Sequence, residues 1–387
     1  MKKNMYLFIP IILLMLISFT VLAQQFDFDV KSAILIDADT GQVLYEKNAD
    51  LELPPASITK IMAMLITMEQ VEKGEISLDD EVTVSRLAAS MGGSQIFLNS
   101  GTRLTIGELL KAVTIPSAND ASVALAEGVA GSYGNFINWM NRRAVELGME
   151  NTKFLNSTGL PEEGGGHYST VKDISIMSQE MVKYPLILEW SSTWVDYLEL
   201  DYRRAMLANT NKLINIYPGM DGLKTGHTSE AGYSLAATAV RNNTRLISVI
   251  LGAETELARG EITTRLLDYG FNSFRKELLV TEGEIVQNIE VPDGKKTVTT
   301  AEAARDLYVQ VQRGKRDLLK KRILLEELET PISKGQVIGQ IKMELESQVI
   351  ASVDLLASED IERAGLFTRL WRSIVNWVGG LITKVLG

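Results

Sequence analysis

The sequence predicts an α+β protein made of two folded units followed by a C-terminal amphipathic helix. The chain has 387 residues, more than twice the length of a typical domain of about 150 residues, so two units are expected. Helix and strand patterns are mixed up to about Phe274, whereas only strand patterns follow it. The last segment differs again, because its apolar residues recur on one face of a helix.

The N-terminus has the features of a secretory signal peptide, which we assign to residues 1–23. Two lysines precede an apolar run from Tyr6 to Leu22, and Ala23 supplies a small residue for cleavage. An uncleaved membrane anchor is the alternative, because the run approaches the roughly 20 residues that a spanning helix needs. Both interpretations predict an exported protein at the outer face of the cytoplasmic membrane.

Strand patterns occur near both ends of residues 24–275. The β-prone runs Ser32 to Ile36 and Gln42 to Glu46 flank a cluster of turn residues and predict a hairpin. A second hairpin is predicted from Ser234 to Val240 and from Arg245 to Leu251, with two asparagines at the turn.

Helix patterns lie between these hairpins. Apolar residues recur at three- and four-residue intervals from Ser57 to Met68. Thr105 followed by Glu108 forms a capping box, which predicts the start of a helix that runs to about Val113. The alanine-rich stretch from Asp120 to Val129 predicts another helix.

Residues 276–360 predict a small β-sandwich-like domain, because β-forming runs alternate with turn signals such as Pro292-Asp293-Gly294. Residues 361–387 predict an amphipathic helix that contains Trp371 and Trp377, with its apolar residues on one face and arginines and a lysine among the remaining positions. Such a helix suits a membrane surface. Packing against the β-rich domain or a partner subunit is the alternative.

The composition excludes several classes of function. A formal net charge of −10 argues against nucleic acid as a partner, since nucleic-acid binding needs a cationic surface. The absence of cysteine excludes disulfides, zinc–thiolate sites and a thiol nucleophile. Two isolated histidines, His167 and His227, predict neither a metal site nor a Ser-His-Asp triad, so a catalytic serine would need another base.

Three short motifs occur in order along the chain: Ser57-Ile58-Thr59-Lys60, Ser117-Ala118-Asn119 and Lys224-Thr225-Gly226. The first motif alone has little weight, because Ser169 with Lys172 and Ser273 with Lys276 show the same spacing. The other two motifs occur once each. Their order and wide spacing match the motif set of penicillin-binding proteins and serine β-lactamases.

The chain resembles low-molecular-mass penicillin-binding proteins of the D-alanyl-D-alanine carboxypeptidase type, those similar to penicillin-binding protein 5. The resemblance is strong over roughly residues 30–275 and extends beyond the three motifs to Pro55-Ala56-Ser57 and Asp221-Gly222-Leu223-Lys224. It implies a β-lactamase/transpeptidase-like catalytic domain, with an antiparallel sheet flanked by helices, over residues 24–275. No cofactor and no metal are implied.

The spacing of Ser57 and Lys60 has a chemical meaning of its own. Residues three apart at a helix start project from one face, so a hydroxyl and an amine can share one proton. A lysine acts as a base near neutral pH only if its ammonium form is disfavoured by burial and a nearby cation. Lys224 is the natural candidate for that cation.

The resemblance implies roles for the remaining residues. Ser57 is the nucleophile that becomes acylated, Lys60 its base, and Ser117 the proton relay to the leaving amine. We expect substrate to be bound by Asn119, Lys224, Thr225, Gly226, His227 and Arg259. These assignments rest partly on the resemblance and partly on the need for a cation beside the free carboxylate of the substrate. Thr225 and Gly226 would lie on an edge strand that can take the peptide as an added strand. The backbone N–H groups of Ser57 and His227 would hold the oxyanion.

The resemblance further implies a peptidoglycan stem peptide ending in D-Ala-D-Ala as substrate and β-lactam antibiotics as covalent inhibitors. A transpeptidase or endopeptidase shares the chemistry up to the acyl-enzyme and stays open. A β-lactamase is the next alternative, although no Glu-x-x-Leu-Asn segment lies between the second and third motifs. A non-catalytic penicillin-binding scaffold would keep the three motifs idle.

Overall fold

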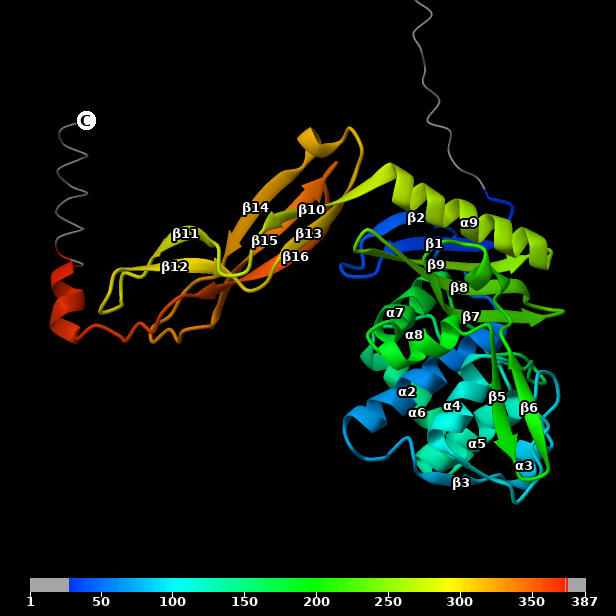
Figure 1. The fold of residues 1–387 in the computed structure, drawn as a ribbon. Coiled ribbons are helices and arrows are strands. Elements are labelled where there is room, and N and C mark those ends of the chain that lie inside the picture. Colours follow the sequence, from blue (N-terminus) through cyan, green and yellow to red (C-terminus); the bar gives the residue numbers. More distant parts are fainter. Residues whose placement is uncertain (1–27, 373, 375–387) are drawn as a thin grey trace, which may run out of the picture.

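The computed structural model describes residues 28–372 and 374. Figure 1 shows two units joined end to end, the first larger and the second built of strands. The predicted signal peptide and most of the predicted C-terminal helix lie outside the described residues. The α+β fold class is confirmed.

The first unit is centred on a five-stranded antiparallel sheet with the order β2-β1-β9-β8-β7. The strands are β1 (Ser32–Asp37), β2 (Val43–Lys47), β7 (Met220–Thr228), β8 (Gly232–Arg241) and β9 (Thr244–Ala253). Both predicted hairpins are therefore confirmed, as β1–β2 and as β8–β9. In the first turn, the N–H and hydroxyl of Thr40 donate to the carboxylate of Asp37.

Helices cover both faces of this sheet (Figure 1). On one face lies α9 (Glu256–Ser273), which approaches closely because Gly270 has no side chain: a Cβ there would lie 2.5 Å from Leu246. The opposite face carries the larger core. Its helices are α2 (Lys60–Glu72), α4 (Ile106–Thr114), α5 (Asn119–Ala130), α6 (Tyr133–Glu146), α7 (Val171–Met181) and α8 (Pro185–Ser192).

Local signals set the helix boundaries. The capping box is confirmed, since Thr105 accepts from the Glu108 N–H and Glu108 accepts from the Thr105 N–H. The predicted helix near Ser57 begins as the 3₁₀ turn η1 (Ala56–Thr59), and α2 starts at Lys60. The first nine residues of α2 are all buried, so this helix lies at the centre of the unit.

Short elements that the sequence patterns did not predict complete the first unit. They are the paired strands β3 (Glu81–Thr83) and β4 (Arg103–Thr105), helix α3 (Arg86–Ala89), the hairpin β5 (Val195–Leu200) with β6 (Arg203–Ala208), and the 3₁₀ turn η2 (Lys212–Asn215).

The second unit has a two-stranded and a five-stranded antiparallel sheet around one apolar core. The smaller sheet pairs β10 (Phe274–Val280) with β13 (Leu307–Gln312). The larger sheet has the order β11 (Ile285–Glu290), β12 (Val298–Ala303), β16 (Gln348–Ala357), β15 (Val337–Leu345) and β14 (Lys320–Leu325). Ile361 and Ala364 are still buried, and helical residues follow from 366.

A buried hydrogen-bond cluster fastens the two units together. The Gln42 side chain donates to the carbonyl of Gln310 and accepts from its N–H, at 2.7 and 2.8 Å. The Gln310 side chain donates to the buried carboxylate of Asp37 at 2.8 Å. The amide of Gln42 thereby pairs with the backbone of β13 as another peptide group would.

Candidate active site

The start of α2 brings together a hydroxyl and an amine. Ser57 lies in η1 and Lys60 is the first residue of α2, so both side chains leave the same turn. The Nζ of Lys60 lies 3.0 Å from the Oγ of Ser57. Ala56, just before the serine, has a φ of +48°, a conformation that costs a non-glycine residue energy and is concentrated at functional sites.

Lys60 Nζ has three hydrogen-bonding contacts. Besides Ser57, it donates to Oδ1 of Asn119 at 2.6 Å and to the carbonyl of Thr158 at 2.7 Å. A neutral amine has two N–H donors and one lone pair. Because Asn119 and Thr158 can only accept at these atoms, they use both donors and leave the lone pair for the hydroxyl proton of Ser57.

The surroundings of Lys60 favour that neutral form. Its side chain is fully buried, and burial, followed by the positive charge of Lys224, lowers its pKa well below the ordinary value. The carboxylate of Asp120 acts in the opposite direction. The predicted causes, burial and a second cation, are therefore both present.

Lys224 is itself a buried amine whose positive charge is disfavoured. It lies in β7, is 1% exposed, and donates to the carbonyl of Thr225 at 3.2 Å. Burial and then the charge of Arg259 lower its pKa to about 7. Arg259 thus helps to lower the pKa of Lys224, and Lys224 helps to lower the pKa of Lys60.

The second motif forms the start of α5, on the other side of Lys60. Two further hydrogen bonds hold Asn119. Its Nδ2 donates to the carbonyl of Gly92, and its backbone N–H donates to the carbonyl of Ser94, both at 2.7 Å. Gly93 between them has a φ of +77°, and a Cβ there would lie 2.8 Å from Asn119 Nδ2. The loop 92–94 is therefore shaped around this amide.

Ser117 stands out by what it does not bond. Its side chain is 4% exposed, and its Oγ has no hydrogen-bond partner among the described residues. Its φ of +66° is also unusual for serine. Buried hydroxyl groups nearly always have a hydrogen-bond partner. A buried hydroxyl without one, in a strained turn, indicates a group that bonds the substrate.

The third motif lies on β7, which is the edge strand of the sheet, as predicted. The hydroxyl of Thr225 pairs with that of Thr210 at 2.6 Å. A Cβ on Gly226 would lie 2.9 Å from the carbonyl of Pro55, so this glycine lets β7 pack against η1. His227 is exposed, and its ring lies 4.1 Å from the ring of Tyr233.

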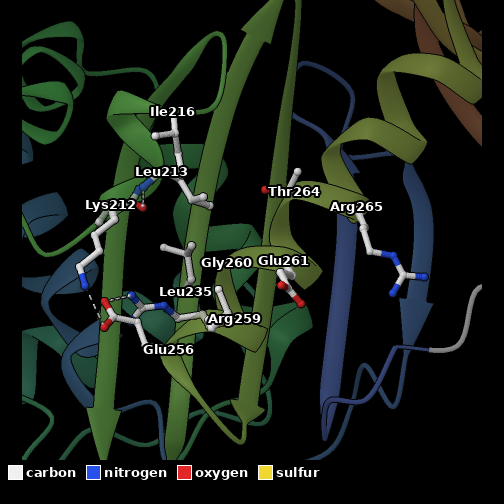
Figure 2. Close-up of a pocket in the computed structure, with 12 residues that line it drawn as sticks. Lys212, Leu213, Ile216, Leu235, Glu256, Arg259, Gly260, Glu261, Thr264 and Arg265 are labelled. Carbon is white, nitrogen blue, oxygen red and sulfur yellow. Dashed lines mark hydrogen bonds and ion pairs between the residues drawn. The ribbon is translucent and has the colours of Figure 1, made fainter.

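Arg259 approaches the site from α9. Figure 2 shows it directed toward Glu256, which also pairs with Lys212, beside a cavity of about 480 Å³ between η2 and α9. The guanidinium lies 3.2 Å from Glu256, and its buried Nε has no partner among the described residues. Arg259 reaches the cluster through its charge on Lys224 rather than through a hydrogen bond.

Sequence reasoning missed Thr158 and Gly159. The carbonyl of Thr158 holds Lys60, and Gly159 permits the contact, because a Cβ there would lie 1.7 Å from the carbonyl of Ala56. The signal was the turn-forming segment Asn156-Ser157-Thr158-Gly159, in which Asn156 accepts from two of the following N–H groups. A backbone acceptor has no side-chain signature, so its role could not be predicted.

Residues outside the cluster have ordinary structural partners. Lys172 pairs with Asp50 and Lys276 with Asp39, so the two other serine–lysine pairs are not second sites. His167 is buried against Thr59 at 2.8 Å, and burial lowers its pKa to about 4. Among the residues that the structure describes, no cluster of acidic or histidine side chains could hold a metal ion.

Comparison with known proteins gives a consistent picture. Residues 19–255 match the family model described as D-alanyl-D-alanine carboxypeptidase, and residues 274–363 match the penicillin-binding protein 5 C-terminal domain. The D-alanyl-D-alanine carboxypeptidase DacF of Bacillus subtilis is 42% identical over 352 residues, covering 90% of each chain.

Two solved structures extend the likeness. Penicillin-binding protein 5 of Haemophilus influenzae has a TM-score of 0.78 and 31% identity, and covers 87% of this chain and 98% of its own. Penicillin-binding protein D2 of Listeria monocytogenes in its ampicillin-bound form has a TM-score of 0.57 and 34% identity. The match covers 63% of this chain and 98% of that one.

Proposed function

The chain belongs to the D-alanyl-D-alanine carboxypeptidase family, and on that premise we propose that it removes the terminal D-alanine from peptidoglycan stem peptides through an acyl-enzyme on Ser57. The observation that carries this proposal is the environment of Lys60. Its two donors are used by Asn119 and Thr158, its charge is disfavoured, and its lone pair faces the serine hydroxyl.

In the acylation step, Lys60 takes the hydroxyl proton while Ser57 Oγ attacks the carbonyl carbon of the penultimate D-alanine. The backbone N–H groups of Ser57 and His227 stabilise the oxyanion, each donor contributing about 3 kcal/mol. The peptide bond then breaks, and the proton that Lys60 took passes through Ser117 to the leaving amine of D-alanine, which leaves Lys60 neutral again. A water molecule hydrolyses the ester with Lys60 again as base, which returns the proton to Ser57.

Substrate recognition follows from the edge strand and from the cations Lys224 and Arg259. An extended stem peptide adds to the free edge of β7 along Thr225, Gly226 and His227. The side-chain amide of Asn119 bonds the substrate backbone. The terminal carboxylate of the substrate binds Lys224, and the positive charge of Arg259 near Lys224 adds to the attraction. A β-lactam has the same carboxylate and an acylating carbonyl, so it should acylate Ser57 in the same pocket.

The test is a paired assay on Ser57→Ala. The wild type should release D-alanine from a D-Ala-D-Ala-terminated pentapeptide and be labelled covalently by fluorescent penicillin. The variant should do neither, although its denaturation midpoint should equal that of the wild type. Penicillin labelling without D-alanine release would favour the scaffold alternative. Faster cleavage of cross-linked peptide dimers to monomers than release of D-alanine from the pentapeptide would favour an endopeptidase.

We also infer that the C-terminal segment attaches the enzyme to the outer face of the membrane. Residues 366–372 are helical at the end of the second unit remote from the active site (Figure 1). Phe367 is 91% exposed and Trp371 69%, an apolar surface that suits a bilayer interface. No helix among the described residues is long and apolar enough to cross a membrane.

Deletion of residues 366–387 tests this attachment, because it leaves Ile361 and Ala364 in the core of the second unit. The shortened enzyme should lose co-sedimentation with anionic lipid vesicles and keep its rate on soluble pentapeptide. Undiminished co-sedimentation would rule out the helix as the anchor.

A further inference from the structure

The exposed aromatic side chains of the first unit gather in one place. Among the described residues, the exposed large aromatic side chains are Phe97, Trp194, Tyr197 and Tyr202 in the first unit and Phe367 and Trp371 in the terminal helix. The first four belong to the β5–β6 hairpin, its flank and the loop that it touches. An exposed apolar cluster of this kind marks an interaction surface.

The hairpin separates its two faces cleanly. Leu198, Leu200, Ala205 and Leu207 point into the helical core. On the outer face, Tyr197 is the cross-strand partner of Met206, and they are 46% and 60% exposed. The guanidinium of Arg204 lies 4.0 Å from the centroid of the Tyr197 ring and pairs with Glu199, which holds the ring in place.

The rings continue to the tip of the hairpin. The hydroxyl of Tyr202 donates to the carbonyl of Phe97 at 2.7 Å, and Arg203 donates to the carbonyl of Ile96. The guanidinium of Arg203 lies within 6 Å of both ring centroids, at 5.9 Å from Phe97 and 5.8 Å from Tyr202. We name this surface the aromatic ledge: Phe97, Trp194, Val195, Tyr197, Tyr202 and Met206.

Both ends of the ledge adjoin the active site. At the base of the hairpin, Thr210 bonds Thr225 of the third motif. At the tip, the loop bearing Phe97 also supplies the carbonyls of Gly92 and Ser94 that hold Asn119. The hairpin, labelled β5 and β6 in Figure 1, runs from the edge strand β7 toward α3, and both of its ends contact segments that carry or hold residues of the site.

We propose that the aromatic ledge binds the carbohydrate backbone of peptidoglycan while the active site holds the end of a stem peptide. This inference rests on the proposed function for its substrate. A stem of five residues spans at most about 17 Å, so the glycan must lie close to the rim of the site. A six-residue strand such as β5 offers a surface about 20 Å long.

The chemistry of the ledge fits sugars better than lipid or a protein partner. Sugar rings have apolar C–H faces that pack on aromatic rings and hydroxyl edges that need hydrogen-bond partners. The ledge alternates rings with Glu199, Asp201 and Arg204, all exposed. Insertion into a bilayer would bury these charges at high cost, and a stable protein interface depletes them from its centre.

A triple variant tests the ledge without touching the catalytic groups: Trp194→Ala, Tyr197→Ala and Met206→Ala together. On glycan strands that still carry pentapeptides, its kcat/KM should fall about tenfold. On free pentapeptide its rate should match the wild type. In the Ser57→Ala background, pull-down on glycan strands stripped of peptide should also be weakened.

Two controls keep the result interpretable. Ile216→Ala with Leu257→Ala removes side chains at the end of η2 and on α9 that are 72% and 71% exposed, and should leave both assays unchanged. Tyr197→Phe keeps the ring and should behave as the wild type, which separates loss of stacking from misfolding.

Equal loss on free and glycan-attached peptide would overturn the ledge as a glycan site, as would unchanged pull-down. Vesicle binding by the chain lacking residues 366–387, if abolished in the triple variant, would reassign the ledge to lipid. If the wild type releases no D-alanine from either substrate, the proposed function fails, while the pull-down on stripped glycan still decides the ledge.

Discussion

The active site and the junction between the two units are both buried polar clusters, yet they are built in opposite ways. At the junction, Asp37, Gln42 and Gln310 are hydrogen-bonded to one another and, for Asp37, also to Thr40, and no like charges meet. In the active site, Lys60 and Lys224 are buried near each other without a carboxylate bonded to either, and the hydroxyl of Ser117 is free.

The difference teaches which cluster serves stability and which serves chemistry. A fully satisfied buried network rigidifies a structure, whereas unsatisfied or repelling groups cost stability and persist where they do work on a substrate. Substitutions at the junction should therefore change unfolding and leave turnover intact. Substitutions in the active site should do the reverse.

The largest effect is expected from Lys60→Met. It removes the base, so kcat/KM for pentapeptide hydrolysis should fall about 10²–10⁴-fold. The denaturation midpoint should change little, because the loss of two hydrogen bonds is offset by relief from burying an amine. A midpoint drop as large as that of a junction variant, with activity retained, would remove the contrast.

The next effect concerns Gln42→Ala at the junction. It leaves the buried N–H and carbonyl of Gln310 without their side-chain partner, which should cost about 1–3 kcal/mol of unfolding free energy for each group left unpaired. Calorimetry should show a lower midpoint, and the rate on pentapeptide should be unchanged. Gln340→Ala is the matched control, since that half-buried glutamine makes one bond, to Asp354.

Arg259→Gln sharpens the comparison through pH. The charge of Arg259 helps lower the pKa of Lys224 to about 7, so its removal lets that pKa rise. Lys224 then stays cationic to higher pH. The alkaline limb of the pH profile of kcat/KM should therefore move upward, with a higher KM from the lost positive charge. Arg265→Gln, on the same helix, should leave the limb in place.

The smallest effect is expected from Lys276→Gln. Lys276 has the same spacing from a serine as Lys60 but pairs with Asp39 at the edge of the junction, where that carboxylate is half exposed. Such surface pairs contribute about 0–1 kcal/mol, so unfolding should shift only slightly and activity not at all. A measurable loss of turnover would mean that the junction communicates with the active site.

Much of the site was predictable, because its chemistry is written in local patterns. The spacing of Ser57 and Lys60, the capping box at Thr105 and the alternating strands are each decided within a few residues. The absence of cysteine and the two isolated histidines had already excluded the competing nucleophile and base.

The β5–β6 hairpin and the junction were not predicted. In the hairpin, apolar and polar residues do not alternate strictly along the sequence, since Tyr197 and Met206 are apolar yet face solvent. Gln42 and Gln310 are 268 residues apart, and a single glutamine in a strand carries no signal of its partner.

The sequence by itself identified the candidate groups for the reaction: a serine, a lysine three residues on, an asparagine and a second lysine. Only the tertiary structure decided that the neutral form of Lys60 is favoured and that its amine lies beside Ser57, by packing Asn119, Thr158 and Lys224 around it from distant parts of the chain. The physical reason is that helix and turn preferences act over neighbouring residues. The pKa of a buried amine instead depends on everything packed against it, whatever its place in the sequence.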